Sequence, residues 1–201
     1  MDKKGIINMR NTGTELFIRT NRLPDALNFS NKLIIAGFPG TGKSTAAKKM
    51  PELFVDMESS DYHWIYKGDT KYTNPEWPKN YIEAILERAN RPYNTDEKHL
   101  YICISTHKEV LDELAARGIY YMAIVPKTKD LYIQRYRDRG SSQEFIDLLD
   151  KKFESFVEDI ENSSAFGIYY TDGYLQNVCL TGGRDVNVTP DFTGLNTVEG
   201  E

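Results

Sequence analysis

Short apolar runs alternate with amphipathic stretches along this chain, and the alternation predicts strands separated by helices. The runs that suit buried strands cover residues 33–36, 53–56, 100–104, 119–125 and 174–180. A run of alternating polarity at residues 15–20 suits an edge strand instead. Strands and helices in turn, joined by short loops, indicate an α/β fold with a mostly parallel five-stranded sheet and helices on both faces.

Helical periodicity fills the segments between these runs. In the clearest case, five apolar side chains share one face of a helix: Tyr81, Ile82, Ile85, Leu86 and Ala89. Capping-box patterns at residues 106–109 and 141–144 open two further helices. Thr128 is placed to cap a helix that runs to about Arg139, where Gly140 ends it.

A glycine-rich loop follows the first buried run, and it is the segment whose sequence motif alone indicates a ligand. Residues Gly37 to Ser44 read G-x-x-x-x-G-K-S, and a short helix follows until Pro51 stops it. Backbone N–H groups of such a loop surround nucleotide phosphates, Lys43 reaches the outer phosphates, and the Ser44 hydroxyl coordinates Mg²⁺. A turn that only joins strand to helix is the alternative, but the flanking strand and helix favour a phosphate site. The expected ATP-binding residues are Gly37, Gly40, Thr41, Gly42, Lys43, Ser44 and Thr45.

Two acids, Asp56 and Glu58, follow the second buried run. A carboxylate at the carboxyl end of a strand can hold Mg²⁺ or accept the proton of an attacking hydroxyl. The third run ends in Ser105-Thr106-His107, without the acid that motor ATPases usually place there. Asp56 is therefore the expected Mg²⁺ ligand beside Ser44 and a catalytic candidate. Glu58 and His107 are weaker substrate candidates, since each also suits an exposed surface position.

Three arginines lie on the helix before Gly140, and Arg135 and Arg139 are four residues apart on one face. Guanidinium groups beside a phosphate loop neutralise charge on a transferring phosphoryl group, so both are catalytic candidates. Arg137 is a weaker substrate candidate. The alternative is a solvated basic face that pairs with neighbouring acids.

Residues 58–78 are rich in aromatic side chains and turn formers. Trp64 is a substrate candidate, because aromatic rings here can stack on a nucleobase or close over an acceptor. The same rings equally suit a small satellite core, and the sequence leaves both interpretations open. No arginine occurs between Asp56 and Glu87, which favours a hydroxyl acceptor or a phosphate met by lysine and by the arginine helix.

Composition narrows the function classes. The chain has 201 residues, 40% hydrophobic and 27% charged, which is enough for one folded domain. A net charge of −5 argues against a nucleic-acid partner held by bulk positive charge. Without a membrane-span pattern or a signal-peptide core, a cytoplasmic location is expected. Cys103 and Cys179 lack metal-ligand spacing and are predicted to be reduced core residues.

Five stretches of the chain carry a resemblance to a known family: GFPGTGKS, VDMESSDYHW, NPEWPKNYIEAI, ICISTHKEV and LYIQRYRDRGSSQEFI. On these stretches the chain resembles the small nucleotide kinases of the adenylate kinase-like superfamily, and more narrowly their phage-encoded members. The resemblance covers roughly residues 33–180.

The resemblance implies a three-layer P-loop kinase fold with a small helical lid. On this basis the kinase domain spans residues 33–180 with its lid near 128–145, after an N-terminal extension at 1–32 and before a mobile acidic tail at 181–201. Gly37 to Ser44 match the triphosphate loop, Arg135 and Arg139 match lid arginines, and Asp56 matches the acid of shikimate and gluconate kinases. The chain departs from adenylate kinases in lacking a long lid insertion, zinc-ligand cysteines and a clear arginine for a nucleoside monophosphate.

The expected function is transfer of the γ-phosphoryl group of ATP, with Mg²⁺, to a nucleotide, a nucleoside or a related small acceptor. One alternative is a nucleotide-binding switch or assembly module with little turnover, which the missing acid after the third strand favours. A third is a kinase that acts on modified bases in DNA, which the net charge disfavours.

Overall fold

The computed structural model describes residues 5–8, 15–18, 31–93 and 99–182. The predicted acidic tail lies outside this part from residue 183 on, as does most of the N-terminal extension. Within the described part, no helix has both the length and the hydropathy needed to cross a membrane.

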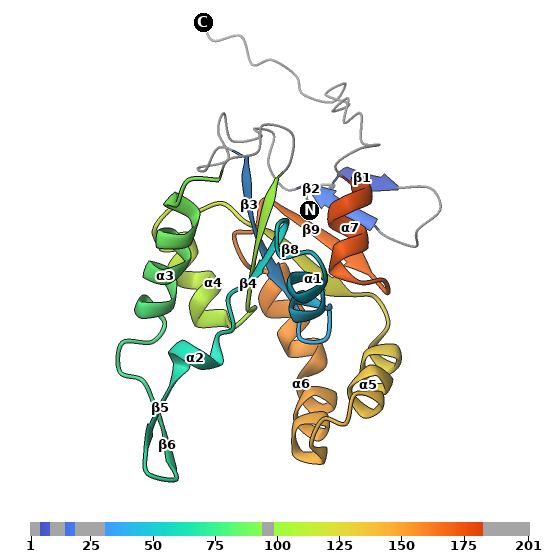
Figure 1. Cartoon of the computed structure of the whole chain (residues 1–201). Helices are drawn as coiled ribbons and strands as arrows, with labels where there is room; N and C mark the ends of the chain where they lie inside the picture. The colour runs from blue at the N-terminus through green and yellow to red at the C-terminus, as the bar shows by residue number, and fades with distance from the viewer. Residues whose placement is uncertain (1–4, 9–14, 19–30, 94–98, 183–201) are drawn as a thin grey trace, which may run out of the picture.

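A seven-stranded sheet forms the centre of this part of the chain (Figure 1). Its five parallel strands stand side by side in the order β4 (Phe54–Asp56), β7 (Leu100–Ile104), β3 (Lys32–Gly37), β8 (Met122–Pro126) and β9 (Gly167–Thr171). Two antiparallel strands, β2 (Glu15–Ile18) and β1 (Gly5–Asn8), continue the sheet beyond β9. The predicted α/β class and parallel five-stranded sheet are confirmed. The run predicted as an edge strand is β2, and β1 rather than β2 forms the edge.

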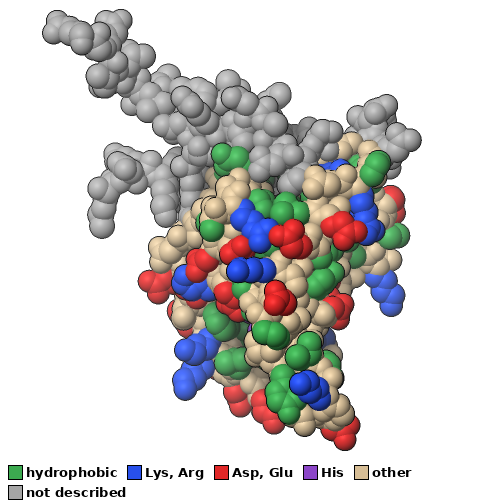
Figure 2. All heavy atoms as spheres, turned by 90° about the vertical axis from the view of Figure 1, so that its left-hand side faces the viewer, with side chains coloured by type: hydrophobic (Ala, Val, Ile, Leu, Met, Phe, Trp, Pro, Cys, Tyr) green, Lys and Arg blue, Asp and Glu red, His purple; other side chains and the backbone are tan. Residues whose placement is uncertain are grey.

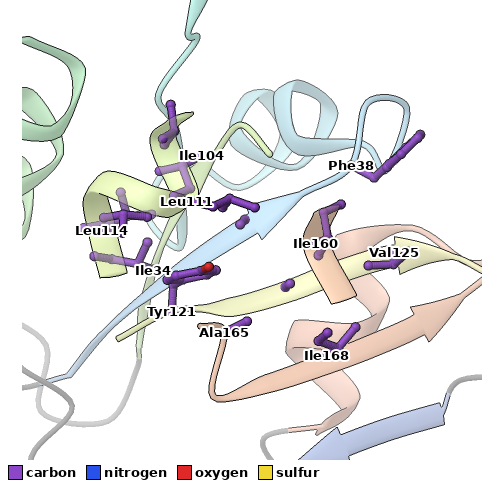
Figure 3. Packing of buried hydrophobic residues seen from close by; sticks show 14 of the residues in the cluster. Ile34, Phe38, Ile104, Leu111, Leu114, Tyr121, Val125, Ile160, Ala165 and Ile168 are labelled. Atoms are coloured by element: carbon purple, nitrogen blue, oxygen red, sulfur yellow. The ribbon is translucent and has the colours of Figure 1, made fainter. Parts of the chain in front are cut away.

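Successive side chains of each strand point to opposite faces of the sheet, and helices cover both faces. Ile34 and Ala36 of β3 face a core formed with α3 (Lys79–Asn90), α4 (Lys108–Ala116) and α6 (Gln143–Glu161). Ile35 faces the opposite core, which α1 (Lys43–Lys49) and α7 (Leu175–Gly182) cover. Figure 3 shows the larger core, in which Leu111 and Leu114 of α4 lie beside strand residues. This alternation produces three layers, with α5 (Lys129–Asp138) packed on α6.

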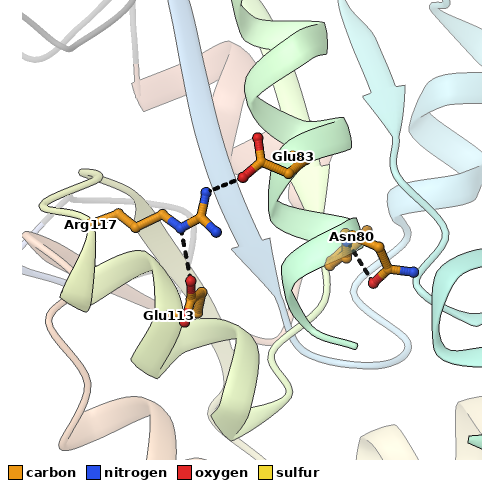
Figure 4. A network of polar contacts seen from close by, with 5 residues as sticks. Asn80, Glu83, Glu113 and Arg117 are labelled. Atoms are coloured by element: carbon orange, nitrogen blue, oxygen red, sulfur yellow. Dashed lines mark hydrogen bonds and ion pairs between the residues drawn. The ribbon is translucent and has the colours of Figure 1, made fainter. Parts of the chain in front are cut away.

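An arginine joins two of the helices on the larger core. Arg117, at the C-terminal end of α4, donates to Glu83 of α3 at 2.5 Å and to Glu113 at 2.8 Å (Figure 4). A guanidinium group shared by two carboxylates fixes the relative position of α3 and α4. The N-terminal end of α4 is therefore held in place next to the candidate site.

The prediction of a strand at residues 174–180 is wrong. This segment begins with exposed Tyr174 and forms helix α7, while the fifth parallel strand is β9, immediately before it. Leu175, Val178 and Cys179 fall at helical spacing and pack against the sheet. The apolar, Cys- and Val-containing composition suggested a strand, but the spacing of the buried side chains is that of a helix. Both cysteines are buried and free, as predicted.

Helix starts differ from the predictions in their capping groups. Helix α6 is capped by Ser142, whose Oγ accepts from Phe145 N, one residue later than the predicted Ser141. Helix α4 has His107 at the N-cap position and no side-chain cap. Thr128 precedes α5, but its Oγ1 donates to Asp172 Oδ2 at 2.7 Å instead of accepting from the helix. Two groups predicted as caps are thus used in tertiary contacts instead: the Glu109 carboxylate bonds to Trp77, and the Thr128 hydroxyl bonds to Asp172.

The aromatic segment forms a short helix, α2 (Ser60–His63), and a hairpin of β5 (Trp64–Lys67) and β6 (Thr70–Thr73). The hairpin is separate from the main sheet and projects from the end of the domain where α2 lies (Figure 1). Tyr66 and Tyr72 are exposed on it. Its turn contains Gly68 at a φ of +58°, which suits a two-residue hairpin loop.

Candidate active site

A cavity of about 860 Å³ opens where the parallel strands end. The loops after β3, β4 and β7 line one part of it, and residues of α1, α4, α5 and α6 line much of the rest. Ligands of parallel α/β sheets bind at this end of the strands, and the volume is large enough for a nucleotide or another small ligand. Most of the site residues predicted from the sequence meet here.

The glycine-rich loop connects β3 to α1 in the predicted way. Gly40 and Gly42 adopt φ angles of +81° and +91°, which side chains rarely tolerate. A Cβ atom at Gly40 would also lie 2.6 Å from the ring of Tyr136. The loop and the first turn of α1 line the cavity, where the N–H groups of a helix start have no intrahelical partner. This backbone is suited to surround an anion.

Thr41 does not line the cavity. It is buried, its Oγ1 donates to Phe38 O at 2.7 Å, and its N–H donates to the same carbonyl at 3.2 Å. Its carbonyl accepts from Leu175 N of α7 at 2.8 Å. Thr41 therefore holds the shape of the loop, while the other predicted loop residues, Gly37, Gly40, Gly42, Lys43, Ser44 and Thr45, line the cavity.

Lys43 lies at the base of the loop, with Nζ donating to Gly37 O at 2.7 Å. Burial lowers the pKa of Lys43 from its ordinary value, and the negative charge of Asp56 opposes this effect. The ammonium group thus points into the loop, where a bound phosphate would compensate for the solvation that the group loses on burial.

Asp56 ends β4, and its carboxylate lies against the start of α1. The Ser44 hydroxyl donates to Asp56 Oδ2 at 2.6 Å. The other carboxylate oxygen, Oδ1, is buried and has no hydrogen-bond partner among the described residues. A buried, unsatisfied carboxylate oxygen next to a hydroxyl is a set of hard oxygen donors, which is what Mg²⁺ binds. These residues therefore fit the expected metal ion.

Arg135 of α5 and Arg139, which directly follows the last residue of α5, reach the same cavity, as predicted from their four-residue spacing. Arg135 lies between the rings of Tyr132 and Tyr174, 4.5 Å from each centroid, and donates to Asp172 O and Gly173 O. Arg139 lies 4.8 Å from the ring centroid of Tyr136, and its Nε donates to Ser141 Oγ at 2.8 Å. Stacking orients both guanidinium groups without neutralising them.

Arg137 differs from its two neighbours on α5. It is exposed and does not line the cavity. On a helix, the position two residues from Arg135 and Arg139 points to another face. The structure therefore does not place Arg137 with the other predicted site residues.

The remaining predicted residues line the cavity on the side of β4 and β7. The Oε1 atom of Glu58 accepts from Ser60 N at 3.2 Å, and Nδ1 of His107 lies 3.0 Å from Ser105 Oγ. Trp64 also lines the cavity. These polar and aromatic groups face the cavity next to Asp56. They lie opposite the part of α5 that adjoins the glycine-rich loop.

The aromatic residues of this side pack mainly on one another. His63 lies between Trp64 and Trp77, with ring centroids at 4.1 Å and 4.4 Å, and Trp77 stacks on Tyr81 at 5.4 Å. The Nε1 atom of Trp77 donates to Glu109 Oε1 at 2.9 Å. The cluster is thus a satellite core that also presents His63 and Trp64 to the cavity. Both interpretations left open by the sequence describe part of it.

Sequence reasoning missed two tyrosines and one wall of the site. Tyr136 is fully buried and donates to Pro39 O of the loop at 2.5 Å, and Tyr174 lies 3.0 Å from where a Gly42 Cβ would be. Side chains of α6 form the wall: Phe145, Leu148, Leu149 and Phe156. The amphipathic pattern of α6 predicted a face that packs in the core. The width of this apolar face did not indicate that part of the face lines a cavity.

No protein-family model matches the sequence, and a search of curated proteins also finds no match. Among solved structures, the chain is similar to the tunicamycin resistance protein of Deinococcus radiodurans. The two chains are 14% identical, and the alignment covers 65% of this chain and 80% of the other with a TM-score of 0.44. A similarity of this size carries no functional argument, so the function is inferred from the site itself.

Proposed function

We propose that this chain is a phosphotransferase that moves the γ-phosphoryl group of ATP, with Mg²⁺, to a small acceptor: a nucleotide, a nucleoside or a related compound. One observation carries the proposal. The Ser44–Asp56 pair, with its unsatisfied carboxylate oxygen, lies in the same cavity as the glycine-rich loop and two stacked arginines. These are the parts that phosphoryl transfer requires, since the protein contributes mainly positioning and charge neutralisation.

Each group has a role that follows from its position. The loop backbone and Lys43 hold the triphosphate, and Ser44 and Asp56 hold the metal ion. When bound, Mg²⁺ neutralises phosphate charge during transfer. Arg135 on α5 and Arg139 directly after it reach the cavity and stabilise the charge of the group in transit. When the acceptor is a hydroxyl, its oxygen bonds to the γ-phosphorus, the bond from that phosphorus to ADP breaks, and the proton passes to Asp56.

The charge distribution on the outer surface supports a small acceptor. On the face shown in Figure 2, Lys, Arg, Asp and Glu side chains are interspersed over the described residues. A protein that binds a nucleic-acid backbone usually presents a stripe of positive charge. A kinase that acts on bases in DNA would need such a stripe on another face.

A coupled assay of ADP release, run with and without a panel of nucleosides and nucleotides, tests the proposal. We expect at least one acceptor to raise ADP release well above the rate with ATP alone. Intact ATP binding with no acceptor-stimulated turnover would contradict it.

A nucleotide-binding switch is the second candidate, and one observation favours it. Strand β7 is followed by Ser105, Thr106 and His107, so no carboxylate follows it directly. A switch would change oligomeric state or partner binding with ATP and would be insensitive to acceptors. Size-exclusion chromatography with and without ATP, run beside the ADP assay, separates the two candidates.

A further inference from the structure

One wall of the cavity is apolar, whereas most of the polar and charged lining residues lie elsewhere in the cavity. Phe145, Leu148, Leu149 and Phe156 of α6 line it. Leu148 is 50% exposed, and Phe145 and Phe156 are partly exposed. Helix α6 packs between α5 and α4, so this apolar wall extends from the arginines toward the side where Glu109 and Lys108 begin α4. Apolar surface in a ligand cavity is a contact for an apolar part of the ligand.

The positive charges that line the cavity lie beside the glycine-rich loop or are paired. Lys43 belongs to the loop itself. Arg135 stacks on Tyr174, which contacts Gly42, and Arg139 stacks on Tyr136, which contacts Gly40. These three cations are therefore placed for the triphosphate.

The fourth cation is Lys108, at the opposite side. Its Nζ lies 2.6 Å from Asp112 Oδ2, and the negative charge of Asp159 also acts on it. Glu58 and Glu109 line the cavity nearby. Among the described lining residues, this side thus offers a phosphate group three carboxylates, Glu58, Glu109 and Asp159, and one lysine that already has a partner.

The two histidines of this side add no positive charge at neutral pH. Desolvation lowers the pKa of His63, which lies between two tryptophans, and of His107, which packs edge-on against His63 and Trp77. The charge of Glu109 opposes both effects but does not reverse them. Neutral imidazoles donate or accept hydrogen bonds and suit a hydroxyl compound.

We propose that the phosphate acceptor is an uncharged compound that carries a hydroxyl group and an apolar face. Its apolar face would contact Leu148 and Phe156, and its hydroxyl would lie toward the Asp56 carboxylate. This inference rests on the proposed function and narrows it, because it excludes nucleoside monophosphates as the preferred acceptors. The reaction is the transfer described above, with ATP as donor and the hydroxyl proton released to Asp56.

Matched pairs of acceptors test the charge requirement. Each common nucleoside is compared with its own 5′-monophosphate, and 2-phenylethanol serves as a minimal apolar alcohol, all in the ADP-release assay. We expect kcat/KM to be about tenfold or more higher for the uncharged member of a pair. Monophosphates that react faster would overturn this inference and leave the phosphotransferase proposal intact. If no compound stimulates ADP release, both proposals fail.

A pair of leucine substitutions tests the apolar wall. Leu148→Gln places an amide in the cavity wall, and Leu131→Gln makes the same change at a similarly exposed leucine of α5 that does not line the cavity. We expect Leu148→Gln to raise the KM for the best uncharged acceptor about tenfold, with the KM for ATP unchanged. Leu131→Gln should change neither value. An unchanged acceptor KM in Leu148→Gln would overturn the placement of the acceptor.

Discussion

The Ser44 hydroxyl donates a hydrogen bond of 2.6 Å to Asp56 Oδ2, across the gap between the start of α1 and the end of β4. The two residues are twelve positions apart in the sequence, and only the parallel arrangement of β3, β7 and β4 brings them together. The other carboxylate oxygen of Asp56, Oδ1, is buried and has no hydrogen-bond partner among the described residues. The metal ion and the acceptor of the proposed reaction therefore depend on one carboxylate.

Replacing that carboxylate separates binding from chemistry. In Asp56→Asn, the side chain keeps its size but loses its charge and its ability to take a proton. We expect kcat for acceptor-stimulated ADP release to fall by about 10²–10⁴-fold. ATP binding, measured by isothermal titration, should remain within a few fold because Lys43 and the loop are unchanged. Turnover at the wild-type rate would contradict the role of Asp56.

Gly40 is constrained both by its φ angle and by the ring of Tyr136. Gly40→Ala combines left-handed strain with a contact of 2.6 Å, while Gly68→Ala has a similar φ of +58° and nothing within 4 Å of the new Cβ. We expect Gly68→Ala to cost about 1 kcal/mol of unfolding free energy and Gly40→Ala clearly more. Urea denaturation measures both. Equal costs would show that Tyr136 does not restrict the loop.

Arg137 at the end of α5 and Arg139 directly after the helix provide a matched test of the charge that stabilises transfer. Arg139 lines the cavity, and Arg137 is exposed outside it. We expect Arg139→Ala to lower kcat by about 10²-fold or more, since a positioned arginine is worth several powers of ten in phosphoryl transfer. Arg137→Ala should stay within about twofold of the wild type. The prediction fails if both variants lose activity equally.

His63 makes stability depend on pH in a defined direction. Its stacking between Trp64 and Trp77 removes solvent and lowers its pKa below the ordinary value of about 6.5. The unfolded chain then binds more protons than the folded chain as the pH falls through 6.5, so acid weakens the fold. Stability should be greatest above this pH and decline toward the lowered, folded-state pKa.

The test of this effect is a His63→Phe variant, which keeps an aromatic ring and cannot titrate. Glu109, Lys71 and His107 also face His63, and His107 has a lowered pKa of its own. We therefore expect the variant to flatten, without abolishing, the loss of unfolding free energy between pH 7.5 and 5.5. Urea denaturation at several pH values measures the slope. An unchanged slope would show that His63 does not carry the effect.

Most of the fold could be predicted because the apolar side chains of its strands and helices recur at a clear spacing. The runs at β3, β4 and β7 and the helical face of α3 are local patterns, and each was located to within a few residues. Helix α7 was missed because Val178 and Cys179 suit a strand by composition, although their spacing with Leu175 is helical. The hairpin was missed as well, since its Gly68-Asp69 turn is short and its strands are exposed.

The site could be predicted from the sequence only at those residues whose function is associated with a recognisable sequence pattern. The loop, Asp56 and the arginine pair follow from motif, strand end and helical spacing. Tyr136 contacts Pro39 across 97 positions, and Leu148 faces the cavity from a helix whose pattern indicates only a core. Such contacts depend on how α5 and α6 pack over the loop, and no local pattern specifies that packing.

Transfer of the γ-phosphoryl group to an acceptor can be observed directly by following the γ-phosphate of labelled ATP. The protein is incubated with ATP labelled at the γ-phosphorus and an acceptor that stimulates ADP release, and the labelled products are separated. We predict that the label appears in an organic phosphate ester with wild-type protein and is almost absent from it with Asp56→Asn. Label recovered only as inorganic phosphate, or only as unreacted ATP, would contradict the proposed phosphotransferase activity.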